Sequence, residues 1–140
     1  MTVSASAPVA TGLQTFLAFD FGIKRTGVAT GNRLTRTASP QPTIAANNDR
    51  RLDAVALRIK EWQPDALVVG VPFHPDGAAH ENTARALKFA RQLRAKFSLP
   101  VFEVDERYST TEAISMRVTD ADAASACIIL EQFLRSLPDE

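Results

Sequence analysis

The sequence has few of the residues that build disulfide frameworks or zinc centres. Its 140 residues include one cysteine and two histidines, His74 and His80. A single cysteine excludes a disulfide framework and a cysteine-based zinc cluster, and two histidines are too few for a His-rich metal site. Any metal would therefore be held by oxygen ligands, and nothing argues for an oxidising compartment.

Long apolar runs and an excess of either charge are also missing. No run approaches the roughly 18 residues of a membrane span, and residues 1–12 lack the basic and apolar regions of a secretory signal. Sixteen basic residues balance sixteen acidic ones. These features predict a single cytoplasmic domain over residues 15–137, preceded by a flexible segment over residues 1–14, with no membrane contact.

The balanced total conceals an uneven charge distribution. Eight basic residues and two acidic ones lie between Lys24 and Lys60, whereas nine acidic and three basic residues follow from Glu103 to the end. A basic flank next to an acidic cluster could hold a polyanion beside a carboxylate metal site. Ordinary surface charge is the alternative interpretation.

Short apolar runs predict the strands of a sheet. Residues 15–20, 66–71 and 101–104 have the nearly continuous apolar character of strands buried on both faces. Gly22 and Gly27 bracket a turn, after which the chain is expected to return as a hairpin and continue into a third strand around residues 34–38. The start of the chain therefore predicts an antiparallel meander.

Helical periodicity appears between and after the later strands. Helices are predicted over residues 49–62, about 81–97 and roughly 122–137, and another is predicted to begin at about residue 109. The prediction rests on apolar positions that recur at helical spacing or on capping residues at the helix start. The basic face of the helix over 81–97 is expected to be solvated. The whole order predicts an α/β fold with a mixed five-stranded sheet, in which parallel strands join a three-stranded antiparallel meander and helices flank the sheet.

Several carboxylates are expected at one edge of this sheet. Sites in open α/β sheets form outside the carboxyl ends of the strands, and four acids follow strand ends: Asp20, Asp76, Asp105 and Glu106. On the last helix, Asp122 projects in the sector of Ala126, Ile129 and Phe133, which must pack against the sheet. A carboxylate on that face is costly unless something compensates its charge.

Clustered carboxylates favour a hard divalent cation, Mg²⁺ or Mn²⁺, and metal-assisted phosphoryl chemistry. Each acid also has a structural interpretation. Asp20 could shape an Asp-x-Gly turn, and Asp105 or Glu106 could pair with Arg107. Asp122 could belong to a capping box and interact with the helix dipole.

Four ordered segments resemble the signatures of the YqgF (RuvX) family. They are the segment from Phe19 to Ala29 (FDFGIKRTGVA), Val69 to Pro72 with Asp76-Gly77, Val104 to Ala113 (VDERYSTTEA), and Asp122 to Ala126 with Ile128 to Leu130. The matches extend over most of the chain. The family usually has a longer stretch before the last helix, so that either this chain is shortened at residues 114–121 or a loop has been left out of the numbering.

The resemblance implies a ribonuclease H-like fold and a nuclease that matures the 5′ end of pre-16S ribosomal RNA. Carried over by position, the catalytic and metal-binding acids would be Asp20, Glu106 and Asp122. Glu106 is adjacent to Asp105, and only one of two successive strand residues can face the site. Phosphate contacts would come from Lys24, Arg25 and Arg107. The implied partners are structured RNA or branched DNA, and ribosomal precursor particles.

Two other function classes fit parts of the sequence. Asp20-x-Gly22 followed by Gly27 also resembles the phosphate loop of actin-like ATPases, which close two lobes around ATP, whereas this chain provides only one. A non-catalytic nucleic-acid-binding factor, acting in ribosome assembly or transcription, could use the same fold, because acids alone do not prove turnover. A metal titration with structured RNA distinguishes a nuclease from a binding module.

Overall fold

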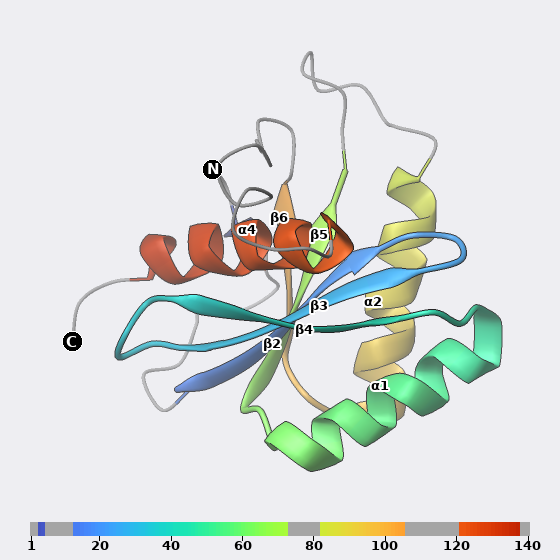
Figure 1. The fold of residues 1–140 in the computed structure, drawn as a ribbon, viewed down its shortest axis with the longest axis horizontal. Coiled ribbons are helices and arrows are strands. Elements are labelled where there is room, and N and C mark those ends of the chain that lie inside the picture. Colours follow the sequence, from blue (N-terminus) through green and yellow to red (C-terminus); the bar gives the residue numbers. More distant parts are fainter. Residues whose placement is uncertain (1–2, 5–12, 73–81, 106–120, 138–140) are drawn as a thin grey trace.

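The chain folds into one sheet with helices on both faces (Figure 1). The structure, a computed structural model, describes residues 3–4, 13–72, 82–105 and 121–137. Its strands are β1 (Val3–Ser4), β2 (Thr15–Phe21), β3 (Thr26–Asn32), β4 (Ala38–Ile44), β5 (Ala66–Val71) and β6 (Val101–Asp105). Its helices are α1 (Asn48–Trp62), α2 (Thr83–Phe97) and α4 (Ala121–Ser136).

The sheet combines an antiparallel half with a parallel half. Its order is β1-β6-β5-β2-β3-β4. Strands β2, β3 and β4 form the antiparallel meander, and β5 and β6 run parallel to β2. The predicted mixed sheet of five strands is therefore confirmed, and the two-residue β1 adds a sixth strand, antiparallel to β6. The remainder of the predicted flexible segment, apart from residues 13–14, lies outside the described residues.

The third meander strand is not where the sequence predicts it. That prediction centres on residues 34–38, but Leu34 is 89% exposed in the connection and β4 begins only at Ala38. Pro40 and Pro42 lie inside β4. Proline is tolerated here because β4 is an edge strand, and an edge strand has amide groups that need no partner.

The alternation of side chains separates two apolar cores. Even-numbered residues of β2, including Phe16 and Ala18, pack with Ile129 and Phe133 of α4. Odd-numbered residues, including Leu17 and Phe19, pack in a second core with residues of α1 and α2. Because successive strand residues face opposite sides, this parity determines which face each polar residue at the strand ends occupies.

Polar contacts fix the ends of the elements. Asp65, before β5, accepts hydrogen bonds from the backbone N–H groups of Gln14 and Thr15 at 2.8 and 3.0 Å, and these bonds lower the pKa of its carboxyl group. Arg36 donates to the carbonyl oxygens of Leu134 and Leu137 at the end of α4. Within the described ranges, no helix has the length and apolar character needed to cross a membrane.

Candidate active site

The first turn of α4 lies directly on the backbone of β3. A Cβ atom added to Gly27 would lie 1.9 Å from the backbone carbonyl oxygen of Asp122, far inside van der Waals contact. Gly27 is also the cross-strand partner of Asp20. The missing side chain at residue 27 therefore allows the acidic first turn of α4 to approach the acidic end of β2.

Asp20 and Asp122 are the predicted site acids that the structure brings together. Asp20 shares the sheet face of Phe16 and Ala18, and α4 covers this face. Burial and the neighbouring Asp122 carboxylate raise the pKa of Asp20 from 3.8 to about 7, and a side-chain hydrogen bond with Ser125 acts in the opposite direction. Two close carboxylates, one of them largely buried, are the arrangement that a divalent cation stabilises in its ionised form.

The hairpin between β2 and β3 brings a cation to this pair. The Arg25 guanidinium lies 3.0 Å from a carboxylate oxygen of Asp122, with 61% of the Arg25 side chain exposed. The turn is tight, because a Cβ atom on Gly22 would lie 2.4 Å from the Arg25 carbonyl oxygen. Lys24 is exposed at the tip. The hairpin thus places Arg25 beside the acids, where it partly neutralises Asp122, and exposes Lys24 at its tip.

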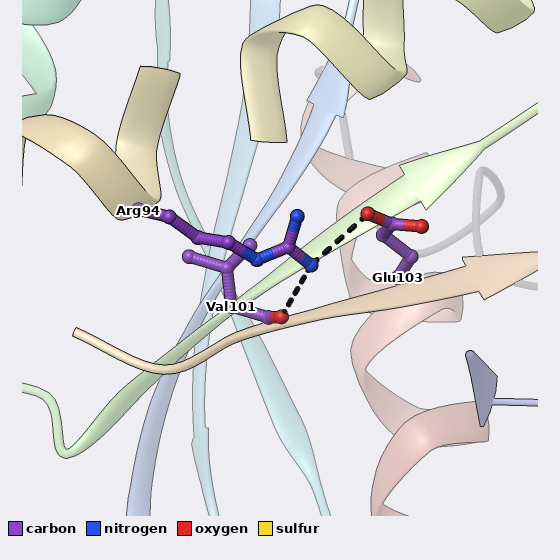
Figure 2. A network of polar contacts seen from close by, with 3 residues as sticks. All are labelled: Arg94, Val101 and Glu103. Carbon is purple, nitrogen blue, oxygen red and sulfur yellow. Dashed lines mark hydrogen bonds and ion pairs between the residues drawn. The ribbon is translucent and has the colours of Figure 1, made fainter. Parts of the chain in front are cut away.

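Strand parity separates Asp105 from the acidic pair. Phe102 and Val104 of β6 pack with α4. Glu103 faces α2, and its carboxylate oxygen lies 3.0 Å from the guanidinium of Arg94 (Figure 2). Figure 2 also shows Arg94 donating to the Val101 carbonyl oxygen, at 2.8 Å. Asp105 has the parity of Glu103 and so belongs to the α2 face, opposite Asp20.

Other predicted site residues cannot be placed. Asp76, Glu106 and Arg107 lie outside the described residues, as do His74, His80 and residues 114–120. Cys127, on α4, is buried in the core between this helix and the sheet. Among the described residues no group of three or more His, Cys, Asp or Glu side chains could hold a metal ion. Asp20 and Asp122 alone are two oxygen ligands of the kind that Mg²⁺ and Mn²⁺ prefer.

Sequence reasoning missed two residues around this site. Ser125, one turn after Asp122, interacts with Asp20, although its position in an alanine-rich segment suggests only packing. Arg51 has only 6% of its surface exposed, and its guanidinium carbon lies 4.3 Å from the centre of the Phe21 ring. It donates to the carbonyl oxygens of Gly22 and Ile23 at 2.6 and 2.5 Å. Arg51 thus attaches the start of the hairpin to α1.

Comparison with protein families decides between the resemblances suggested by the motifs. A family model described as "RuvX: Holliday junction resolvase" matches residues 14–136. The chain belongs to the RuvX family. A RuvX relative from Polaromonas sp. (strain JS666), named "Putative pre-16S rRNA nuclease", is 75% identical over 99% of this chain and 100% of its own length. A relative of the same name from Burkholderia thailandensis is 53% identical, covering 90% of this chain and 91% of its own.

Solved structures confirm the predicted fold of this RuvX chain. Thermus thermophilus RuvC, in complex with a Holliday junction substrate, superposes with a TM-score of 0.58 and 15% identity, covering 88% of this chain and 94% of RuvC. The Fowlpox virus resolvase, in complex with Holliday junction DNA, gives a TM-score of 0.55 and 11% identity, covering 87% and 97%. At these identities the likeness concerns the fold, which is ribonuclease H-like.

Proposed function

We propose that this RuvX chain is a divalent-metal-dependent nuclease that hydrolyses a phosphodiester bond in the 5′-end maturation of pre-16S ribosomal RNA, in the cytoplasm. The observation that carries the proposal is the carboxylate pair formed by Asp20 and Asp122, where burial and mutual repulsion favour an added cation. The names of the RuvX relatives supply the substrate class.

The proposed catalytic and metal-binding residues are Asp20, Asp122 and Glu106. Glu106 is preferred to Asp105 because Asp105 belongs to the sheet face opposite Asp20. When bound, Mg²⁺ or Mn²⁺ would supply Lewis acidity and a water of lowered pKa. Asp20 must give up its proton to hold such an ion, and the Ser125 hydrogen bond favours the ionised carboxylate.

The proposed partner is the phosphate backbone of structured RNA, within a ribosomal precursor particle, with branched DNA as the alternative substrate. Lys24, Arg25 and Arg107 are the proposed phosphate contacts. The Arg25 ion pair with Asp122 is largely exposed, so its contribution to stability is small and its guanidinium can exchange a carboxylate for a phosphate at little cost.

A cleavage assay with matched variants tests this function. Protein from a nuclease-deficient host is incubated with RNA spanning the mature 5′ end, with Mg²⁺, with Mn²⁺ and with EDTA. We expect cleavage only with metal, and a loss of at least about 100-fold in rate for Asp20→Asn, Asp122→Asn and Glu106→Gln, comparable to the loss of a key electrostatic group. Asp105→Asn, one residue from Glu106, should retain the wild-type rate.

Three results would overturn parts of the proposal. RNA binding without metal-dependent cleavage would favour the non-catalytic binding factor. Faster cleavage of a four-way DNA junction than of the RNA would move the substrate to branched DNA. Loss of activity in Asp105→Asn, with Glu106→Gln unaffected, would reverse the assignment of the third acid.

A further inference from the structure

A basic pocket lies on the sheet face opposite the acidic pair. It holds about 220 Å³ and is lined by residues of β2, the hairpin, α1 and α2, among them Phe21, Arg51, Arg85, Lys88 and Gln92. None of its lining residues among those the structure describes is acidic. Three cations from two helices therefore line one cavity with no carboxylate from the described residues beside them, which is a composition suited to an anion.

The basic side chains of α2 differ in whether they already form an ion pair with an acidic side chain. The helix carries five basic residues and no acidic one between Thr83 and Phe97. Arg94 is held by Glu103 at 3.0 Å, and Lys96 lies 4.0 Å from Asp53. Arg85 has a neutral partner, the Asn82 side-chain oxygen at 3.1 Å, and no ion pair with any residue that the structure describes. For Lys88, no ion pair or hydrogen bond occurs within the part of the chain that the structure describes. The two exposed cations at the pocket thus keep their charge available.

The inner wall of the pocket is a buried cation. Arg51 has only 6% of its surface exposed and packs against Phe21, and its Nε–H group has no hydrogen-bond partner among the residues that the structure describes. A buried guanidinium with no ion pair within the described residues is costly, and an anion in the pocket would offset part of that cost. Arg51 also holds the carbonyl oxygens of Gly22 and Ile23, so the pocket and the hairpin share one side chain.

The pocket and the acidic pair flank the same strand end. Asp20 and Phe21 are consecutive in β2 and so face opposite sides of the sheet, Asp20 toward α4 and Phe21 toward α1 and α2. The hairpin that follows them contributes Ile23 to the pocket and pairs Arg25 with Asp122. Because one hairpin contacts both sites, the arrangement favours a ligand that extends across both, such as a nucleic-acid strand, over a free phosphate.

We propose that the pocket between β2, α1 and α2 binds a backbone phosphate of the same RNA strand, a few nucleotides from the cleaved bond, through Arg85 and Lys88. This inference rests on the proposed nuclease function for the identity of the strand. Phosphate contacts of this kind set the register of a bound strand without reading its sequence.

Binding measurements with matched charge variants test the pocket. The affinity of a fluorescein-labelled RNA spanning the mature 5′ end is measured by anisotropy, in EDTA, over a range of KCl concentrations. Arg85→Gln and Lys88→Gln should each weaken binding about fivefold or more and lower the slope of log K against log[salt] by roughly 0.7, the value for one single-strand phosphate. Arg91→Gln removes the same charge from the same helix outside the pocket and should weaken binding less than twofold. Equal effects of Arg91→Gln and Lys88→Gln, or none from either pocket variant, would overturn the proposal.

Two further binding measurements identify the source of the phosphate. Single methylphosphonate linkages remove one backbone charge at a time, and one position should weaken the wild-type complex clearly more than the Lys88→Gln complex, in which Arg85 alone still contacts that phosphate. No such position, together with binding of inorganic phosphate or AMP that Lys88→Gln abolishes, would make the ligand a free anion and overturn the strand assignment. Because Arg85 and Lys88 are exposed, both variants should fold, which circular dichroism checks.

Failure of the pocket and failure of the nuclease function remain distinguishable. Binding is measured without metal, so an inactive enzyme does not affect it. Lys24→Gln serves as the comparison at the hairpin. A weakened complex for Lys24→Gln with an unchanged one for Lys88→Gln would reject the pocket alone, whereas absence of metal-dependent cleavage by the wild type would reject the nuclease function alone.

Discussion

Asp20 has an environment that favours its protonated form. It lies under α4, beside the Asp122 carboxylate, and burial and this charge together raise its pKa to about 7. The arrangement destabilises the metal-free protein at neutral pH, since one unit of pKa shift corresponds to about 1.4 kcal/mol. Such a cost is typical of sites where function rather than stability determines the residue.

The raised pKa of Asp20 predicts how stability depends on pH. The folded state keeps the Asp20 proton up to about pH 7, whereas the unfolded state loses it near pH 3.8. This contribution to stability is therefore fully present below about pH 4 and is lost as the pH rises through 7. The Asp20→Asn variant has no ionisable group at this position. Without metal we therefore expect its Tm to exceed that of the wild type by roughly 5 °C or more at pH 8, and the two Tm values to be nearly equal at pH 4.

Thermal melts in EDTA between pH 4 and 8 measure this difference. Asp53→Asn is the matched control, because the Asp53 side chain is 76% exposed on α1 and its substitution should shift Tm by a constant small amount. A Tm difference between wild type and Asp20→Asn that does not change with pH would contradict the assigned environment of Asp20.

At the scale of elements, the site depends on the contact between β3 and the first turn of α4. Asp20 belongs to a strand and Asp122 to a helix more than 100 residues later in the sequence. Their proximity rests on Gly27, the cross-strand partner of Asp20, whose backbone touches that of Asp122. The geometry of the acidic pair is therefore set by a residue that carries no chemistry of its own.

Gly27→Ala should separate the two acids. The added methyl group would lie 1.9 Å from the Asp122 carbonyl oxygen, so the first turn of α4 must move. We expect a destabilisation of about 1–3 kcal/mol from overpacking and a loss of cleavage of about 100-fold, since small displacements at a site have large effects on rate. Cleavage and Tm are measured on the same preparation. Wild-type cleavage by a stably folded Gly27→Ala protein would show that this contact does not position Asp122.

At the scale of the whole molecule, the sequence predicts the central elements better than the edges. The run from Ala66 to Val71 is apolar throughout, and β5 has those bounds because it is buried on both faces. The sequence predicts the edge strand β4 at the wrong position, because the strand contains two prolines and only its last residue, Ile44, is fully buried, so it has no clear apolar pattern.

The same contrast applies to the candidate site. The meeting of Asp20 and Asp122 follows from strand ends and helix periodicity, which act over the whole fold. Arg51 could not be predicted, because a cation in an amphipathic helix is normally solvent-facing, and its burial depends on Phe21 and the hairpin carbonyl oxygens, which are distant in sequence. Local patterns thus give the position of an acid on its element and miss contacts made only after folding.

Metal binding should connect the acidic pair to the stability of the whole molecule. A cation that binds only the folded state raises stability by mass action, by about 2.7 kcal/mol at a concentration 100 times its Kd, and so raises Tm by several degrees. Because Asp20 must release its proton to bind the ion, we expect the gain in Tm on adding Mn²⁺ to be small at pH 5.5 and to increase up to pH 8. Differential scanning calorimetry measures the gain, with NaCl of equal ionic strength as the control. Asp20→Asn and Asp122→Asn should lose the gain in Tm, and Asp105→Asn should keep it. An equal gain for the wild type at both pH values would mean that Mn²⁺ stabilises the fold without displacing the Asp20 proton.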